Sequence, residues 1–530
     1  MFTTGCDEDR HQSVKAEDAG VRPPAEAGEE AQTPSYTPPA PLAGIVAEPD
    51  DAAATLYDPG QLRTYELTVA EEDLRFLDQN PRAEQYVRGS LRVDGETVEN
   101  VGIRYKGSVG AFIFPCTPWF GGGAATRGTT AAGPTSTPDE PTQSDEPSDL
   151  PVEKLASTDI DGGVADLFDA DGGLGDPAPS PDGDAPTDDP AATTEDTTQA
   201  PAKYGKCSVK VSFNEYVPKR EFHGVRKLLF HSMNHDRSML RDRLAYQMFR
   251  EQGLAAPRSV HARLVINGKF EGLFALVEQV DGRFTRSRFT EGGTGNLYKE
   301  VWPLHSDPAV YENALTTNED DAADVSAFVA FHEAVTTGDR SLAGFIDPQA
   351  IMRWLAADRV MMNDDGPLHF WCGRGGQGNN PGGFGNHNYY WYQRAADEHF
   401  TLIPWDMDSS LAGSAFVHIR PQWRATAGCG CVGTLVPASC DDFVQWLLTE
   451  ERAFEVAVDE FIAGPFNAVH VDALLSQWSH QISAAVRENA ERPGAPSFEQ
   501  WRSSVESLRS AIASMRKHRG YDYENNPMIW

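Results

Sequence analysis

Carboxylates that follow apolar stretches are the side chains best suited to chemistry in this sequence. Asp406 and Asp408 end a run that begins at Phe400, and the cluster Asn363-Asp-Asp365 lies earlier in the chain. Burying a charge is costly unless a partner or a metal ion compensates it. The pattern therefore predicts a functional site built on carboxylates.

The segments that must position these acids are predicted to be two buried strands. Tyr389-Tyr-Trp-Tyr392 and the run 400–405 are dominated by aromatic and β-branched residues, and a polar stretch at 393–399 separates them. Such runs around a polar turn are typical of a hairpin of strands. The second strand would deliver Asp406 at its end.

Composition excludes several classes of function. The chain has 530 residues and a formal net charge of −34, but residues 1–60 hold 12 acidic against 3 basic side chains, and residues 121–200 hold 18 against 2. No basic footprint remains, so we expect no nucleic-acid partner. No apolar run reaches the roughly 18 residues that a membrane-spanning helix needs.

The charge distribution also divides the chain. We predict a disordered acidic tether over 1–60 and a disordered acidic insert over 121–203, because Pro, Ala, Thr, Gly and Asp dominate both and bury too little apolar surface to fold. The folded domain then covers 61–413. A Cys-bearing loop and helices over 414–530 complete the same domain.

The cysteines indicate an extracytoplasmic protein. Met1-Phe-Thr-Thr-Gly-Cys6 is similar to the end of a bacterial lipoprotein signal, so a lipidated Cys6 is one expectation and a chance cysteine the other. Six further cysteines form an even set, which favours disulfides, and a Cys116–Cys207 bond would close the base of the insert. The remaining four are Cys372, Cys429, Cys431 and Cys440.

Periodicity and turn residues predict the order of elements. The expected strands are 64–69, 87–93, 98–105, 207–213, 225–231, 260–266, 270–280 and 296–299. The expected helices are 71–80, 240–252, 325–335, 348–362, 441–463, 471–490 and 498–518.

This order, and a set of short stretches, resembles the CotH (spore coat protein H) kinase family. The stretches are Arg104-Tyr-Lys-Gly-Ser108, Lys210-Val-Ser-Phe213, Asn234-His-Asp-Arg-Ser-Met-Leu-Arg241, Ala256-Pro257, Val265-Ile-Asn-Gly268, Gly272-Leu-Phe-Ala-Leu-Val-Glu278, Asn296-Leu-Tyr-Lys299, Asn386-His-Asn-Tyr-Tyr390 and Ile403-Pro-Trp-Asp406. The resemblance implies an α+β, atypical protein-kinase-like fold. Its sheet-rich N-lobe would cover about 61–281, and a mainly helical C-lobe would begin at about 282.

The resemblance also implies an activity. A member of this family would be a secreted or surface-associated kinase that transfers the γ-phosphoryl group of ATP to Ser or Thr of protein substrates with Mg²⁺ or Mn²⁺. Such transfer needs one carboxylate at the hydroxyl nucleophile and another at the metal. Asp365 would take the first role and Asp406 the second, although a shift of one residue would exchange Asp365 for Asp364.

The same comparison suggests further metal ligands. Asn388 corresponds to the metal-binding Asn of a kinase catalytic loop, and Asn386 is an alternative. Asp408 would be a co-ligand of Asp406 or a cap of the following turn.

Three nucleotide-binding groups complete the prediction. Lys210 lies on a strand where a kinase fold keeps the lysine that pairs with the phosphates, and Lys106 and Lys227 compete with it. The turn Lys106-Gly107 would lie over the phosphates. The segment around Glu278 would be the hinge that contacts adenine through its backbone.

Two other functions stay open. The usual kinase signatures Gly-x-Gly-x-x-Gly, Val-Ala-Ile-Lys, His-Arg-Asp and Asp-Phe-Gly are missing from the sequence. One alternative is therefore a surface or coat binding protein without turnover. The other is a hydrolase whose metal is held by His387, Asp406 and Asp408.

Overall fold

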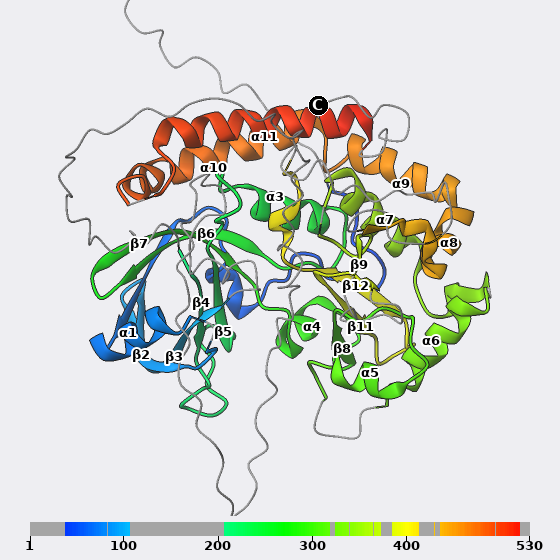
Figure 1. Cartoon of the computed structure of the whole chain (residues 1–530), viewed down its shortest axis with the longest axis horizontal. Helices are drawn as coiled ribbons and strands as arrows, with labels where there is room; N and C mark the ends of the chain where they lie inside the picture. The colour runs from blue at the N-terminus through cyan, green and yellow to red at the C-terminus, as the bar shows by residue number, and fades with distance from the viewer. Residues whose placement is uncertain are drawn as a thin grey trace, which may run out of the picture. The chain divides into compact units, whose positions relative to one another are not determined.

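The computed structural model describes residues 38–81, 83–106, 206–318, 324–338, 340–363, 365–372, 384–412, 429, 435–492 and 494–519. All of them belong to one compact unit, Tyr36–Trp530. Figure 1 shows this unit as a mixture of strands and helices, so the protein is an α+β protein, as the sequence predicts.

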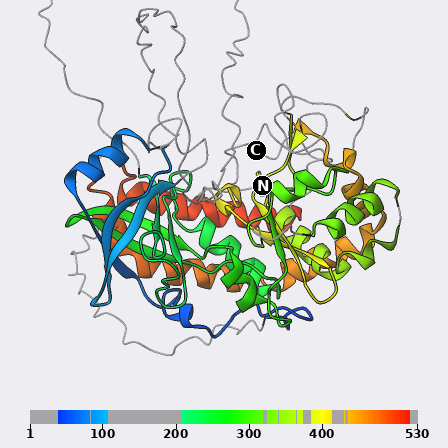
Figure 2. The ribbon, with the colours of Figure 1, turned by 90° about the horizontal axis from the view of Figure 1, so that it is seen from below.

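Seven strands form a closed barrel in the order β1-β2-β3-β4-β5-β7-β6. Neighbours pair antiparallel except β1 and β6, whose parallel pairing closes the barrel. A closed barrel leaves no strand edge open to another chain. The strands, coloured from blue to green in Figures 1 and 2, are β1 (Arg63–Val69), β2 (Val87–Val93), β3 (Glu96–Lys106), β4 (Ser208–Ser212), β5 (Lys227–His231), β6 (Ser259–Ile266) and β7 (Lys269–Val277).

The two faces of the barrel wall have different roles. Val209, Val211 and Phe230 belong to the apolar core inside the barrel. Because successive side chains of a strand point to opposite faces, Lys210 lies on the outer face, and Leu229, its register partner, belongs to the second core of the molecule. The outer face of β4 and β5 is therefore turned toward the second core.

Residues 38–60 form a strap across the barrel and its neighbours, which we call the N-terminal strap. Leu42 and Tyr57 are buried, and Asp51 forms an ion pair with Arg258 at 2.9 Å between Oδ1 and Nη1. The sequence places these residues in a disordered tether. The strap is ordered because its few apolar side chains, spaced without period, each enter a core contributed by other segments.

The second core lies among helices and two small sheets. The strand orders are β12-β11-β8 and β10-β9-β13, and the predicted hairpin of β11 and β12 is confirmed. These strands are β8 (Asn296–Lys299), β9 (Phe370–Cys372), β10 (Phe384–Gly385), β11 (Tyr389–Gln393), β12 (Phe400–Pro404) and β13 (Leu435–Val436).

The predicted helices occur in the predicted order, with one division, and the structure adds α4 (Gly282–Arg288) and α5 (Pro308–Asn313), which the sequence analysis did not predict. The stretch predicted as one helix over 441–463 is two helices, which meet at Glu450. The helices are α1 (Glu71–Gln79), α3 (Arg241–Glu251), α4 (Gly282–Arg288), α5 (Pro308–Asn313), α6 (Ser326–Thr336), α7 (Pro348–Val360), α8 (Asp442–Thr449), α9 (Glu451–Ala463), α10 (Ala468–Asn489) and α11 (Phe498–His518), with short 3-10 turns η1 (Ala52–Thr55), η2 (Arg340–Gly344), η3 (Met407–Ser409) and η4 (Ala438–Cys440).

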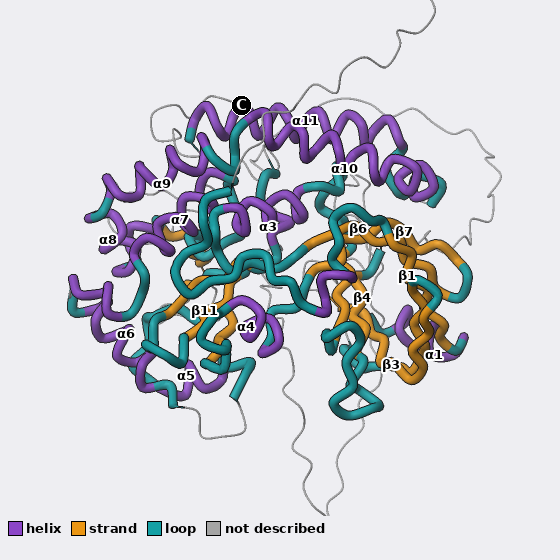
Figure 3. The backbone as a smooth tube through the Cα atoms, turned by 180° about the vertical axis from the view of Figure 1, so that it is seen from behind, coloured by secondary structure: helices purple, strands orange, loops and turns teal. Residues whose placement is uncertain are grey.

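The last two helices brace elements of both cores. The indole N–H of Trp501 in α11 donates to the carbonyl of Ser238, just before α3, at 2.9 Å. In α10, the Asn489 side chain accepts from the N–H of Leu273 in β7 at 3.3 Å. Figure 3 shows α10 and α11 running beside α3, β6 and β7. None of the helices in the described ranges is long and apolar enough to cross a membrane.

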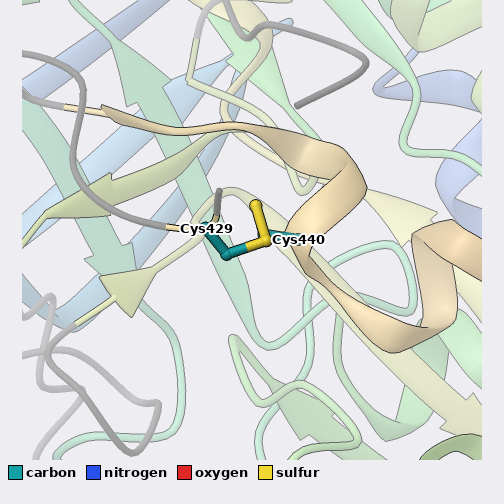
Figure 4. The surroundings of a disulfide bond; sticks show 2 residues. All are labelled: Cys429 and Cys440. Carbon is teal, nitrogen blue, oxygen red and sulfur yellow. A yellow bond between two sulfur atoms is a disulfide. The ribbon is translucent and has the colours of Figure 1, made fainter. Parts of the chain in front are cut away.

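Disulfide bonding is confirmed for part of the cysteine set. Cys429 and Cys440 are bonded, with a Cα–Cα distance of 5.4 Å, and the bond lies just before α8 (Figure 4). Cys207 is also disulfide-bonded. Its expected partner Cys116 lies outside the described residues, as do Cys6 and Cys431.

Candidate active site

Asp365 lies in a tight loop after α7. Inside this loop the Asn363 side chain donates to Asp358 Oδ1 at 2.8 Å, and Asp358 is 2 % exposed. A Cβ atom at Gly366 would lie 2.8 Å from the same Asp358 oxygen, so a glycine is required there. Burial raises the pKa of Asp358 to about 7. The buried Asp358 and Asn363 pair thus shapes the loop that carries Asp365.

Asn388 connects this loop to the second acidic segment. Its side-chain N–H₂ donates to both Asp365 Oδ2 and the Asp365 carbonyl at 2.9 Å. Its own carbonyl accepts from the N–H of Trp405 at 3.1 Å. Because Trp405 directly precedes Asp406, the two acids that are far apart in sequence lie in neighbouring segments.

Strand β12 ends at Pro404, and the chain then makes a constrained turn. Asp406 has φ 45° and ψ 65°, in the left-handed region, and η3 follows it and carries Asp408. Asn388 also has a positive φ of 66°. Such conformations are unfavourable for non-glycine residues and occur often at functional sites. Two of the predicted site residues, Asn388 and Asp406, thus have left-handed backbone.

The charges of several acids act on Asp408. Burial raises the pKa of Asp408 well above its ordinary value, and the charges of Asp406, Asp242 and Asp365 raise it further, while Arg241 opposes them. Four carboxyl groups therefore share one electrostatic environment. We call Asp242, Asp365, Asp406 and Asp408 the acidic cluster.

Asp242, in the first turn of α3, is the member of the cluster that the sequence analysis missed. It is 2 % exposed, and its Oδ2 lies 3.4 Å from Nδ1 of His231 on β5. The helix start is held by Asp236, whose Oδ2 accepts from the N–H of Arg241 at 2.8 Å. The sequence feature that could have identified Asp242 was the run of three charged residues at 241–243, next to the apolar residues that predict this helix.

Of the predicted lysines, Lys106 contacts the segment that leads to Asp406. Its Nζ is 5.3 Å from the centre of the Trp405 ring, within the range of a cation–π contact. Lys210 is 3 % exposed and pairs in register with Arg104 of β3. Lys227 pairs with Ser212 at the other end of β4. Gly107 lies outside the described residues.

Glu278 holds a second buried charge centre, which differs from the acidic cluster. Its carboxylate accepts from Arg258 at 2.7 Å and also from Arg283 and Arg288. Burial alone would raise the pKa of Glu278, but the charges of Arg288, Arg258 and Arg283 outweigh it and hold the pKa below its ordinary range. Its N–H donates to the Arg258 carbonyl at 2.8 Å. These groups of Glu278 serve internal contacts, and adenine binding by the neighbouring backbone stays a prediction.

The alternative ligands Asn386 and His387 have different surroundings. The Asn386 side chain is completely buried, donates to the Pro367 carbonyl at 2.8 Å and accepts from the Tyr389 hydroxyl at 2.8 Å. The Asn386 side chain thus connects the loop at Pro367 to β11, whereas the Asn388 side chain contacts Asp365 directly. Within the described part of the chain, no group of three or more His, Cys, Asp or Glu side chains is arranged to hold a metal ion. This finding gives no support to a three-ligand site at His387, and Asp364 lies outside the described residues.

A divalent cation nevertheless fits the charge of the cluster. Burial first, and then the neighbouring carboxylates, raise the pKa of Asp408, so a cation at this place would favour the ionised form of Asp408. Mg²⁺ is commonly bound through one or two carboxylates together with substrate phosphates and water, so it does not need a complete cage of protein ligands. The oxygen donors of Asp406, Asp408 and Asn388 have the chemistry that Mg²⁺ or Mn²⁺ prefers.

Comparison with known proteins assigns the chain to a family. The family model described as CotH kinase protein matches residues 201–518, which is more than half of the chain. The chain belongs to the CotH kinase family. The match covers the barrel from β4 onward, the acidic cluster and all later helices.

One curated relative of this CotH-family chain is the inner spore coat protein H of Bacillus subtilis (strain 168). The two are 26% identical over 222 residues, which cover 39% of this chain and 55% of the relative. The chain therefore spans about half the length of the curated relative that it matches. The resemblance read from short stretches of the sequence is confirmed at the level of the family.

Proposed function

We propose that this CotH-family protein is an atypical protein kinase that transfers the γ-phosphoryl group of ATP to Ser or Thr side chains of a protein. The observation that carries the proposal is the link Asp365–Asn388–Trp405, which sets the Asp365 loop beside Asp406. Phosphoryl transfer needs such a pairing of a carboxylate for the nucleophile with a carboxylate for the metal.

The proposed arrangement has two lobes with ATP between them. The barrel forms the smaller lobe and presents Lys106 and Lys210, and the helical part presents the turn after β12. The contact of Lys106 with Trp405 and the outward side of Lys210 support this arrangement. Because Lys106 contacts Trp405, which directly precedes Asp406, we assign the phosphate contact to Lys106 first.

Each residue then has a defined role. Asp365 accepts the proton of the Ser or Thr hydroxyl as its oxygen attacks the γ-phosphorus, and the bond from that phosphorus to the bridging oxygen breaks to release ADP. Asn388 orients Asp365 and contributes an amide oxygen. Asp406, with Asp408, holds the divalent cation. When bound, Mg²⁺ or Mn²⁺ neutralises charge on the phosphates and aligns them for transfer.

We also propose that the protein works outside the cytoplasm, attached to a membrane surface through a lipidated Cys6. The disulfide Cys429–Cys440 and the disulfide-bonded Cys207 support an oxidising compartment. Intact-mass analysis of the native protein for a lipid on Cys6 tests the anchor.

The kinase proposal is tested with γ-labelled ATP, Mn²⁺ or Mg²⁺ and a Ser-rich protein acceptor. We expect label on the acceptor from the wild-type chain and none from Asp406→Asn. Label released as free phosphate would instead show a hydrolase. No turnover in spite of measurable nucleotide binding would show a binding protein without kinase activity.

A further inference from the structure

Glu300 lies just after β8 and has no part in the proposed chemistry, although it contacts the residue that joins the two acidic segments. Its side-chain oxygen Oε1 accepts from the backbone N–H of Asn388 at 3.1 Å. Its own backbone N–H donates to the carbonyl of Tyr389, the next residue, at 3.2 Å. Glu300 therefore holds two consecutive residues where β11 begins.

The backbone leaves the strand conformation at this place. The last register pair between β8 and β11 is Lys299 with Tyr390. Beyond it, Glu300 has φ 51° and Asn388 has φ 66°, so both lie in the left-handed region, which is unfavourable for residues other than glycine. Such a conformation persists only where the surrounding contacts impose it. The two hydrogen bonds of Glu300 are contacts of this kind.

Asn388 is held from three sides. Its side-chain N–H₂ donates to the Asp365 loop, and its carbonyl accepts from the N–H of Trp405. Glu300 supplies the third contact, on the backbone N–H. Asn388 is 9 % exposed, and a buried N–H requires a hydrogen-bond partner. The contact with Glu300 thus fixes the backbone from which the Asn388 side chain reaches Asp365.

We propose that Glu300 is a positioning residue for phosphoryl transfer, which fixes the backbone of Asn388 and, through it, the carboxylate of Asp365. This inference rests on the proposed function, because Asp365 is assigned there to the hydroxyl nucleophile. Glu300 acts as a hydrogen-bond acceptor and takes no part as an acid, a base or a metal ligand. A displacement of a catalytic group by about 1 Å can lower a rate about a hundredfold, so a contact behind Asp365 has a measurable effect.

Two variants separate the hydrogen bond of Glu300 from its charge. Glu300→Gln removes the charge but keeps a side-chain oxygen that can accept from the N–H of Asn388. Glu300→Asp keeps the charge, but its side chain is one methylene shorter and no longer reaches that N–H. Aspartate also tolerates left-handed backbone, so the second variant does not disturb the turn.

The test measures initial rates with γ-labelled ATP, saturating Mn²⁺ and a Ser-rich protein acceptor. Glu300→Gln should keep kcat within about threefold of the wild type. In Glu300→Asp, kcat should fall about 10–100-fold while KM for ATP changes by less than about twofold, because the groups assigned to the nucleotide are intact. An unchanged kcat in Glu300→Asp would overturn the proposal. A loss confined to Glu300→Gln would also overturn it, because the charge would then be the required property.

A double-mutant cycle distinguishes positioning from a general loss of stability. If Glu300 acts through Asn388, Glu300→Asp should lower the rate by less than about twofold in a chain that already carries Asn388→Ala. Equal losses in both backgrounds would show that Glu300 acts independently of Asn388 and would contradict the proposal. Melting temperatures show that each variant is folded at the assay temperature.

A matched control lies at the other end of the hairpin of β11 and β12. Glu398 also has a left-handed φ of 59°, and it is exposed in the turn between the two strands. Glu398→Asp should leave both kcat and KM unchanged. A loss equal to that of Glu300→Asp would show a general effect of damage to the hairpin and would count against a specific role for Glu300.

The outcomes also separate this inference from the proposed function. No transfer by the wild-type chain would refute the proposed function and, with it, the role of Glu300. Transfer by the wild-type chain at a rate that Glu300→Asp matches would refute the role of Glu300 alone.

Discussion

Two of the buried charge centres among the described residues are built in opposite ways. Around Glu278, three arginines and the strap residue Asp51 form a network in which the carboxylate is fully compensated. In the acidic cluster, Asp242 and Asp408 lie among other acids, and the pKa of Asp408 is raised. A compensated buried charge stabilises its surroundings, whereas an uncompensated one is retained at the expense of stability.

The comparison separates a carboxylate that serves internal ion pairs from the acids that carry the proposed active site. Sequence reasoning placed Glu278 and Asp406 in one nucleotide site. The arginines around Glu278 connect its carboxylate to the N-terminal strap and to α4, and adenine binding by the backbone beside it stays a prediction. The segment of Asp406 has left-handed backbone, and burial together with the neighbouring carboxylates raises the pKa of Asp408.

The largest expected effect is loss of phosphoryl transfer in Asp406→Asn. Removing the charge that holds the cation should lower the rate at least about a thousandfold. The fold should persist, because the amide has the same shape and repulsion falls. Initial rates with γ-labelled ATP and the melting temperature measure both. Unchanged transfer would remove Asp406 from the active centre.

The next effect concerns the compensated centre. Glu278→Gln leaves Arg258, Arg283 and Arg288 without their shared carboxylate and should lower the free energy of unfolding by about 3–5 kcal/mol. Urea unfolding followed by tryptophan fluorescence measures the loss. Asp408→Asn is the matched variant from the other centre and should not destabilise the metal-free chain. Equal destabilisation by both variants would contradict the conclusion that the charge of Glu278 is compensated and that of Asp408 is not.

A smaller effect depends on pH and concerns Asp358, the buried acid behind the Asp365 loop. Its pKa of about 7 lies above the ordinary value of 3.8, so the folded state binds more protons than the unfolded state between these two pH values. Stability should therefore fall as pH rises through this window, by up to about 4 kcal/mol. In Asp358→Asn this dependence should shrink. Unfolding curves from pH 4 to pH 8 for both chains test it, and parallel curves would contradict the assignment.

The smallest expected effect distinguishes the two lysines. Lys106→Met should weaken binding of the ATP analogue by about tenfold, since one charge-assisted contact to phosphate is lost. Lys210→Met should have the smaller effect of the two. Calorimetric titration gives both affinities. A larger loss in Lys210→Met would reverse the assignment of the phosphate contact.

Local patterns were sufficient for much of the fold. The hairpin of β2 and β3 was predicted from alternation around Asp94-Gly95, and α3 from apolar residues at 240, 244 and 248 that stop before Gly253. These elements are encoded by neighbours in sequence, because strand alternation and helix periodicity act over a few residues. The aromatic hairpin that leads to Asp406 was predicted in the same way.

Contacts between distant segments were not predicted. Closure of the barrel pairs β1 with β6, which are far apart in the chain, and the strap is ordered by cores to which it contributes only isolated side chains. Asp242 has no motif of its own. Its place in the acidic cluster depends on how α3 packs against η3.

The sequence by itself indicated the family, the order of most of the longer strands and helices, and the two segments that carry Asp365 and Asp406. Only the tertiary structure decided that Asn388 joins those segments and that Asp242 enters the cluster. It also decided that arginines form ion pairs with the Glu278 carboxylate. The physical reason is the range of the interactions. Backbone preference and hydrophobic periodicity are local along the chain, whereas the environment of a buried charge is set by residues that meet only after folding.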